Sequence, residues 1–188
     1  MEHDIKIQIL LEQIAVLNDK VAFEQLFYQY FKKLHRFANA IVRDRQTSEE
    51  VVSDVFVNIW ENRSKLLEIE NLNNYLYIAT KNIAIRNRIK QNAIRQICIE
   101  EITIESTVLK SSSPDEIFLN KELIKRYEAV VNTLPARCQT IYKLARQDGL
   151  RYKEIATILN ISVKKIDAQM AIALKKITQA VKFITDEK

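Results

Sequence analysis

Apolar residues recur at helical spacing along most of this chain, with one clear interruption. The periodicity fades near residues 100–115, where three consecutive serines precede Pro114 in a stretch that disfavours a helix. The same stretch is acidic, because it contains Glu100, Glu101 and Glu105. The pattern therefore predicts two helical domains joined by a short acidic linker, with the bounds 1–97, 98–114 and 115–188.

Capping residues place the individual helices within these domains. Asn18-Asp19 caps the first of them, Thr47 with Glu50 has the spacing of a capping box, and Asn73-Asn74 begins a third helix. In the second domain, Pro114 and the acids after it open a helix at a position where proline and negative charge are favoured. The expected helices lie at about 19–42, 47–63 and 73–96, and at about 115–133, 135–148, 152–159 and 162–185.

Composition supports an all-α fold. The chain has one glycine and two prolines, too few turn residues for a β-rich protein. Cys98 and Cys138 each stand alone, and His3 and His35 are far apart, so we expect reduced thiols and no zinc site. Because no Gly-rich phosphate loop or Ser/Cys–His set is present either, the sequence predicts no metal, no cofactor, no catalytic residue and no enzymatic activity.

The N-terminal residues do not resemble a targeting segment. Glu2 and Asp4 precede the first apolar stretch, unlike the start of a signal peptide, and no apolar run approaches the roughly 18 residues of a membrane span. A cytoplasmic location is therefore expected.

The last two expected helices have the pattern of a helix-turn-helix. Ile155, Ala156 and Leu159 give the first of them an apolar stripe. Asn160 suits the left-handed conformation of the turn, and Ser162 can cap the second helix.

The second helix of this motif has one apolar and one basic face. The apolar arc is expected to be buried and comprises Val163, Ile166, Met170, Ala173, Leu174 and Ile177. The opposite arc comprises Lys164, Lys165, Ala168, Ala171, Ile172, Lys175 and Lys176, with Gln169 on its flank. Lysines that contact phosphates beside small side chains that approach base edges are typical of a recognition helix. An ordinary solvated helix pair is the alternative.

A second signal is the helix expected to start near Thr47. One half of its wheel should be core and holds Val51, Val52, Val55, Phe56, Ile59 and Trp60. The other half is polar and acidic, except for Val57 at its centre. A single exposed valine is common, but an apolar centre ringed by carboxylates is also typical of a helix that docks onto another protein.

The third signal is a basic helix without any acidic residue between Asn71 and Ile99. Tyr75 and Tyr77 lie at its start, and four asparagines add amide groups. Cations combined with aromatic rings suit single-stranded DNA, which binds through backbone charge and base stacking. The alternative is a solvated basic helix whose tyrosines are buried.

Together these segments resemble the extracytoplasmic-function (ECF, group IV) sigma factors of the sigma-70 superfamily, over nearly the whole chain. Residues 22–30 (AFEQLFYQY) resemble the opening of region 2 in that family, and residues 49–60 (EEVVSDVFVNIW) its polymerase-docking helix. Residues 75–82 (YLYIATKN) are similar to the segment that leads into its promoter-opening helix. Leu134-Pro135 and residues 149–156 (GLRYKEIA) resemble region 4.

The resemblance implies a role for each surface. The docking helix is expected to bind the coiled coil of the largest subunit of core RNA polymerase through Glu50, Ser53, Asp54, Val57 and Glu61. The loop expected from about Asn62 to Asn74, together with the basic helix after it, is expected to capture the unpaired −10 promoter element. The residues expected to contact it are Asn73, Asn74, Tyr75, Tyr77, Lys81, Asn82, Arg86, Arg88 and Lys90. The −35 element is expected to contact Arg151, Tyr152, Ser162, Lys164, Lys165, Ala168, Gln169, Ile172 and Lys175.

The resemblance also implies that the acidic linker lies in the polymerase cleft. It makes an anti-sigma factor a further expected partner and predicts no small-molecule substrate. The protein would then lie with the nucleoid, or at the inner membrane when an anti-sigma factor holds it there. Gln169 and Ile172 stand where relatives often carry Arg or Lys, so the −35 sequence does not carry over, and the amides Asn73 and Asn74 are also less usual.

Two other functions explain part of the pattern. A helix-turn-helix regulator with a helical effector or dimerisation domain accounts for the second domain, but leaves the docking helix and the basic helix without a role. Such a regulator would bind duplex DNA tightly by itself, whereas a sigma factor usually needs core polymerase. A helical adaptor without nucleic-acid contact would show neither behaviour.

Overall fold

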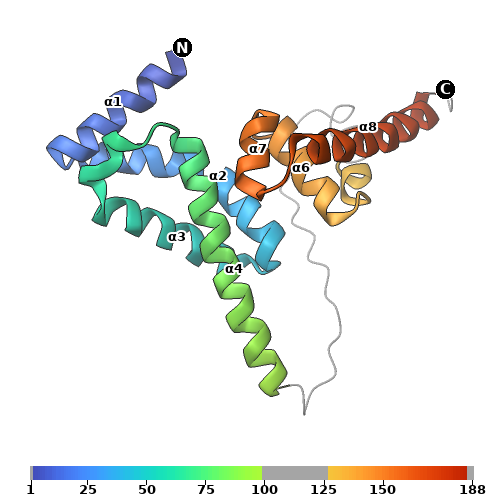
Figure 1. The fold of residues 1–188 in the computed structure, drawn as a ribbon, viewed down its shortest axis with the longest axis horizontal. Coiled ribbons are helices and arrows are strands. Elements are labelled where there is room, and N and C mark those ends of the chain that lie inside the picture. The colour runs from blue at the N-terminus through green and yellow to red at the C-terminus, as the bar shows by residue number, and fades with distance from the viewer. Residues whose placement is uncertain (1, 99–126, 186–188) are drawn as a thin grey trace, which may run out of the picture. The chain divides into compact units, whose positions relative to one another are not determined.

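The computed structural model describes residues 2–98 and 127–185, and within these residues it consists of helices and turns without a strand (Figure 1). This confirms the all-α prediction. The helices are α1 (Glu2–Leu17), α2 (Lys20–Val42), α3 (Arg45–Glu61), the 3-10 helix η1 (Arg63–Glu68), α4 (Leu72–Cys98), α6 (Ala136–Arg146), α7 (Tyr152–Leu159) and α8 (Val163–Thr185). Residues 127–132 are also helical. None of the described helices combines the length and apolar character needed to cross a membrane.

The helices form two compact units. The N-terminal unit contains α1, α2, α3, η1 and most of α4, and the C-terminal unit contains α6, α8 and residues 152–156 of α7. The expected linker falls outside the described residues apart from Cys98, as does most of the helix expected from residue 115. The linker and its exact bounds therefore stay a prediction.

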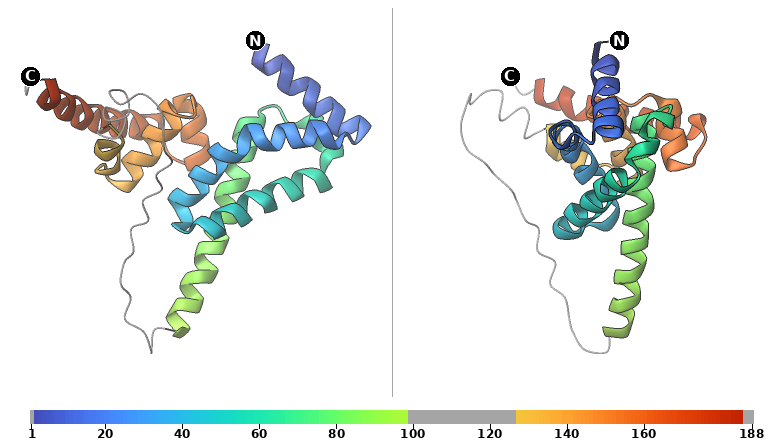
Figure 2. Two further views of the ribbon diagram at one scale, coloured as in Figure 1. Left: turned by 180° about the vertical axis from the view of Figure 1, so that it is seen from behind. Right: turned by 90° about the vertical axis from the view of Figure 1, so that its left-hand side faces the viewer.

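In the core of the N-terminal unit α2 packs against α3, and the two helices run side by side in the left view of Figure 2. In α2 the apolar side chains at i and i+4, such as Ala22, Leu26, Tyr30 and Leu34, face inward and are buried. The predicted core positions of α3, Val51, Val52, Val55, Phe56 and Ile59, are also buried, and Trp60 is half-buried.

Two helices begin earlier than their expected caps. Asp44 is the N-cap of α3, and its Oδ1 accepts hydrogen bonds from the backbone N–H and the hydroxyl of Thr47 at 2.7 and 2.6 Å. The predicted capping box of Thr47 with Glu50 is therefore wrong, since the Thr47 hydroxyl donates to Asp44 instead of capping the helix. Similarly, α4 begins at Leu72, and Asn71 Oδ1 accepts from the Asn74 N–H at 2.9 Å.

The segment after α3, expected to be a loop, contains η1. Leu66 of η1 is buried, and η1 packs against α1. The guanidinium of Arg63 lies 4.8 Å from the ring centroid of Trp60 and Arg63 Nη1 donates to the Trp60 carbonyl at 2.8 Å. These contacts fix the path of the chain between α3 and α4.

The C-terminal unit is built on the packing of α6 against α8. Ile141 of α6 and Ile166 and Met170 of α8 are buried there. Cys138 is fully buried, its Sγ–H donates to the Gln169 carbonyl at 3.2 Å, and burial raises the pKa of the thiol. The hydroxyls of Tyr127 and Tyr142 are 2.9 Å apart, and burial raises the pKa of Tyr127 to about 12.

The buried stripe of α8 is narrower than predicted. Ile166, Met170, Ala173 and Ile177 are buried at spacings of three and four residues, as expected. Val163 and Leu174, however, expose 38% and 39% of their surface, so their assignment to the core is wrong. Val163 is the first residue of the helix, and Leu174 lies on the edge of the stripe next to the exposed basic arc.

Candidate docking and nucleic-acid surfaces

The outer face of α3 has the composition that the sequence predicts. Glu50, Ser53, Asp54 and Glu61 are exposed, and Val57 in their midst exposes 54% of its surface. All of them lie opposite the buried stripe that holds α3 on α2. This docking face is therefore an apolar centre within a polar and acidic rim, available to a partner.

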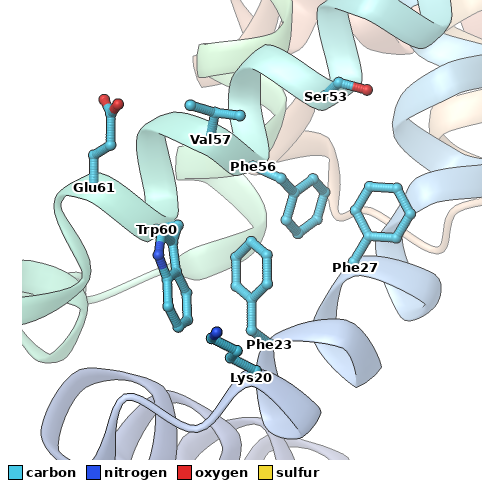
Figure 3. Close-up of a pocket in the computed structure, with 8 residues that line it drawn as sticks. All are labelled: Lys20, Phe23, Phe27, Ser53, Phe56, Val57, Trp60 and Glu61. Carbon is cyan, nitrogen blue, oxygen red and sulfur yellow. The ribbon is translucent and has the colours of Figure 1, made fainter.

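An aromatic groove adjoins the docking face between α2 and α3. Figure 3 shows Phe56 and Trp60 pointing from α3 toward Phe23 and Phe27 of α2, while Val57 and Glu61 point away from them. The rings pack closely, with centroids 5.0 Å apart for Phe23 and Trp60 and 4.9 Å for Phe27 and Phe56. The groove has a volume of about 520 Å³, and Lys20, Ser53, Val57 and Glu61 complete its lining.

Sequence reasoning missed the α2 side of this groove. Lys20, Phe23 and Phe27 were not among the expected site residues, although Phe23, Phe27 and Phe31 follow one another at i, i+4 spacing, which places three rings on one face of the helix. That spacing is a signal for an aromatic stripe. What it cannot reveal is which helix completes the groove.

The two tyrosines at the start of α4 have different surroundings. Tyr75 is 38% exposed and can offer its ring to a ligand. Tyr77 is 1% exposed, and its ring packs edge-on against Phe37 with centroids 5.3 Å apart. Its expected role at the −10 element is therefore wrong, because a side chain in the core cannot stack on a base. The two residues are about 200° apart around the helix.

The asparagines at the start of α4 are partly engaged within the N-terminal unit. Asn73 Oδ1 accepts a hydrogen bond from the Tyr30 hydroxyl at 2.8 Å. Asn74 is half-buried. Asn82, about two turns further along, is exposed. Of these expected −10 residues, Asn82 is thus the one most open to solvent.

The basic residues of α4 do not form one surface. Arg88 lies on the side of α2, where its Nη1 donates to the Ile41 carbonyl at 3.3 Å. Lys81 lies on the same flank by helical spacing. Arg86 and Lys90 lie on the opposite flank and line a groove with α3. Between the two flanks, Tyr75, Asn82, Ile85 and Ile89 are exposed.

The turn between α7 and α8 closes as predicted at Asn160. This residue has φ of 53°, in the left-handed region, and the two bonds of a Schellman motif follow, from Asn160 N–H to the Thr157 carbonyl at 3.3 Å and from Ile161 N–H to the Ala156 carbonyl at 3.0 Å. At the start of α7, Glu154 Oε2 accepts from the Arg151 N–H at 2.7 Å. Ser162 Oγ accepts from the Lys165 N–H at 3.4 Å and caps α8.

The side chains expected to read the −35 element are open to solvent for the most part. Tyr152 and Gln169 are half-buried, and the following are exposed: Arg151, Ser162, Lys164, Lys165, Ala168, Ile172 and Lys175. Ile172 exposes 43% of its surface at the middle of the basic arc. The helix-turn-helix therefore presents lysines around a patch of small and apolar side chains, a surface suited to a DNA groove.

Comparison with known families assigns both units. The family model described as Sigma-70 region 2 matches residues 26–94, and the model described as Sigma-70, region 4 matches residues 124–177. Together the two matches cover more than half of the chain. The chain is a sigma-70-family sigma factor of the ECF type. Region 2 of this sigma factor contains α3 and the docking face, and region 4 contains α7 and most of α8. Sigma factors are transcription initiation factors, not enzymes.

Individual relatives agree with this assignment. The RNA polymerase sigma-H factor of Pseudomonas aeruginosa is 23% identical to this sigma factor over 179 residues, 92% of each chain. Two solved structures are similar in fold at 18% identity. One is the sigma factor RpoE of Bartonella quintana in complex with the anti-sigma factor NepR, with a TM-score of 0.59 over 85% of this chain and 96% of that one. The other is CnrH in complex with the cytosolic domain of CnrY, with a TM-score of 0.55 over 94% and 97%.

Proposed function

We propose that this sigma factor binds the coiled coil of the largest subunit of core RNA polymerase through the docking face of α3, and that it then directs the enzyme to promoters. The observation that carries the proposal is Val57, an exposed apolar side chain at the centre of an acidic face. The adjoining aromatic groove enlarges this surface, because Ser53, Val57 and Glu61 belong to both. An apolar side chain of the polymerase would fill the groove.

Promoter recognition follows from the two DNA-facing surfaces. In region 2, Tyr75 and Asn82 on the open face of α4 would contact the unpaired −10 strand by stacking and hydrogen bonding. In region 4, α8 would enter the major groove at the −35 element, with Lys164, Lys165 and Lys175 on phosphates. A helix-turn-helix regulator that acts alone would need neither the docking face nor the open face of α4.

The experiment that tests this function is transcription from a genomic promoter library by bacterial core polymerase, with and without the full-length protein. We expect binding to core and a set of start sites, absent with core alone, that share upstream −10 and −35 sequences. An absence of core binding and of start sites above the core-only background would contradict the proposed function.

Tyr75 offers a test of −10 recognition. Replacing it by alanine removes the one exposed ring at the start of α4, and stacking of a base on an aromatic side chain contributes about 1–3 kcal/mol. We expect the saturated holoenzyme to open promoters roughly tenfold less efficiently, measured by permanganate footprinting. Tyr28→Ala is the matched control, since Tyr28 is 68% exposed on α2 and should be neutral. An equal effect of both variants would remove Tyr75 from the DNA surface.

This function places the protein in the cytoplasm, where core polymerase and the nucleoid are. It also makes an anti-sigma factor an expected partner, as in the complexes of the two structural relatives. Such a protein would act by covering the surfaces that polymerase and promoter need.

A further inference from the structure

A second groove lies on the other side of the docking face, between α3 and α4. It has a volume of about 300 Å³ and is mainly polar. From α3 it is lined by Asp54, Val57 and Asn58, and from α4 by Arg86, Asn87 and Lys90. Val57 therefore belongs to the lining of both this polar groove and the aromatic groove.

The polar groove has unused cationic groups. Arg86 and Lys90 are exposed, and within the described residues neither forms an ion pair with a carboxylate. The Nε of Arg86 makes one long hydrogen bond, 3.4 Å, to the Asn82 carbonyl. This leaves the terminal nitrogens of Arg86 and the ammonium of Lys90 able to donate to an anion, with the amides of Asn58 and Asn87 nearby.

We propose that the polar groove binds a carboxylate side chain of the polymerase coiled coil, so that Arg86 and Lys90 belong to the docking surface and not to the −10 DNA surface. The inference rests on the proposed function, and it changes the assignment of two residues that the sequence alone places at the −10 element. The partner therefore has to supply a carboxylate beside the apolar side chain that contacts Val57.

Position favours the polymerase over DNA as the source of the anion. A helix that covers Val57 also covers the groove, because Val57 is part of its wall. Once covered, the two cations lose water, and a partner without an opposite charge would leave them unpaired at a large cost. The Asp54 carboxylate of the groove would repel either anion and so does not distinguish them. DNA is disfavoured by position, because the groove lies on the flank of α4 that meets α3, whereas Tyr75 and Asn82 lie on the open face of α4.

Charge reversal on the two flanks of α4 tests the inference. Arg86→Glu is compared with Arg88→Glu, the same change on the opposite flank of the same helix, in the full-length protein. The dissociation constant for core polymerase is measured without DNA. Promoter binding is then measured with holoenzyme formed at saturating sigma factor, on a promoter identified in the transcription experiment.

We expect Arg86→Glu to weaken core binding about tenfold and Arg88→Glu to change it less than twofold. Promoter binding by holoenzyme saturated with the Arg86→Glu variant should equal that of the wild type. Lys90→Glu should behave like Arg86→Glu, which guards against a local effect of one substitution. Circular dichroism of each variant should show the same helix content as the wild type.

Unchanged core binding with either Arg86→Glu or Lys90→Glu would overturn the inference. A loss of promoter binding by holoenzyme saturated with the Arg86→Glu variant would overturn it too. The docking face is judged separately. If Val57→Glu abolishes core binding while Arg86→Glu does not affect it, the inference fails and the proposed function stands. If neither variant affects core binding, the docking face itself is misplaced.

Discussion

Replacing Val57 by glutamate is expected to weaken binding to core RNA polymerase by roughly 100-fold, about 3 kcal/mol, the range of residues at the centre of an interface. The substitution places a carboxylate at the apolar centre of a face that is already acidic, where a docked partner would strip it of water. Fluorescence anisotropy with labelled protein and purified core enzyme measures the affinity.

The fold should tolerate this change, since Val57 exposes 54% of its surface and takes no part in the core. Val16→Glu is the matched control, because Val16 is 65% exposed on α1, which contributes no residue to the docking face or to the lining of either groove. We expect the control to bind core as the wild type does. If the two variants bound equally well, α3 would not be the docking helix.

Replacing Ile166 by alanine is expected to destabilise region 4 by about 2–5 kcal/mol, the cost of emptying a buried aliphatic site. Ile166 is 0% exposed on α8, in the unit where α6 and α8 pack together. Hydrogen exchange of the full-length protein, resolved by peptide, should show loss of protection in α6 and α8 and unchanged protection in α2 and α3. Transcription that depends on the −35 element should fall with it.

Ile172 provides the control on the same helix. It carries the same side chain but exposes 43% of its surface, so Ile172→Ala should leave protection of α6 and α8 nearly unchanged. Any effect of that variant on transcription would then come from the DNA surface, where Ile172 can contact a thymine methyl group. Equal losses of protection in both variants would contradict the described packing of α8.

The sequence predicts well those features that depend on one helix and its own turns. The buried stripe of α3 follows from the 100° step alone, and Asn160 takes the left-handed conformation because few other residues tolerate it. The same step separates Tyr75 from Tyr77, so the different environments of the two rings were within reach of the sequence. Because Tyr75 and Tyr77 are close along the chain, both were expected at the −10 element, but on a helix they point in nearly opposite directions.

Features that depend on two helices were beyond the sequence. The N-cap of α3 is a local exception, because Asp44 and Thr47 are both competent caps and the sequence alone does not show which of them meets the free N–H groups. The basic residues of α4 lie on two flanks, one beside α2 and one beside α3. The sequence does not show which helix lies beside which flank, and so it does not show that these residues belong to different surfaces. Both grooves beside Val57 are likewise products of packing between helices.

The place of Val57 in the walls of both grooves has a consequence for inhibition. If the polymerase docks on Val57 as proposed, a ligand seated in either groove would occupy part of the surface that the polymerase needs. An antagonist that fills only one groove would then compete with the polymerase, and its apparent dissociation constant would rise linearly with the free core polymerase concentration. A small apolar ligand in the aromatic groove and a small anionic ligand in the polar groove would share this behaviour.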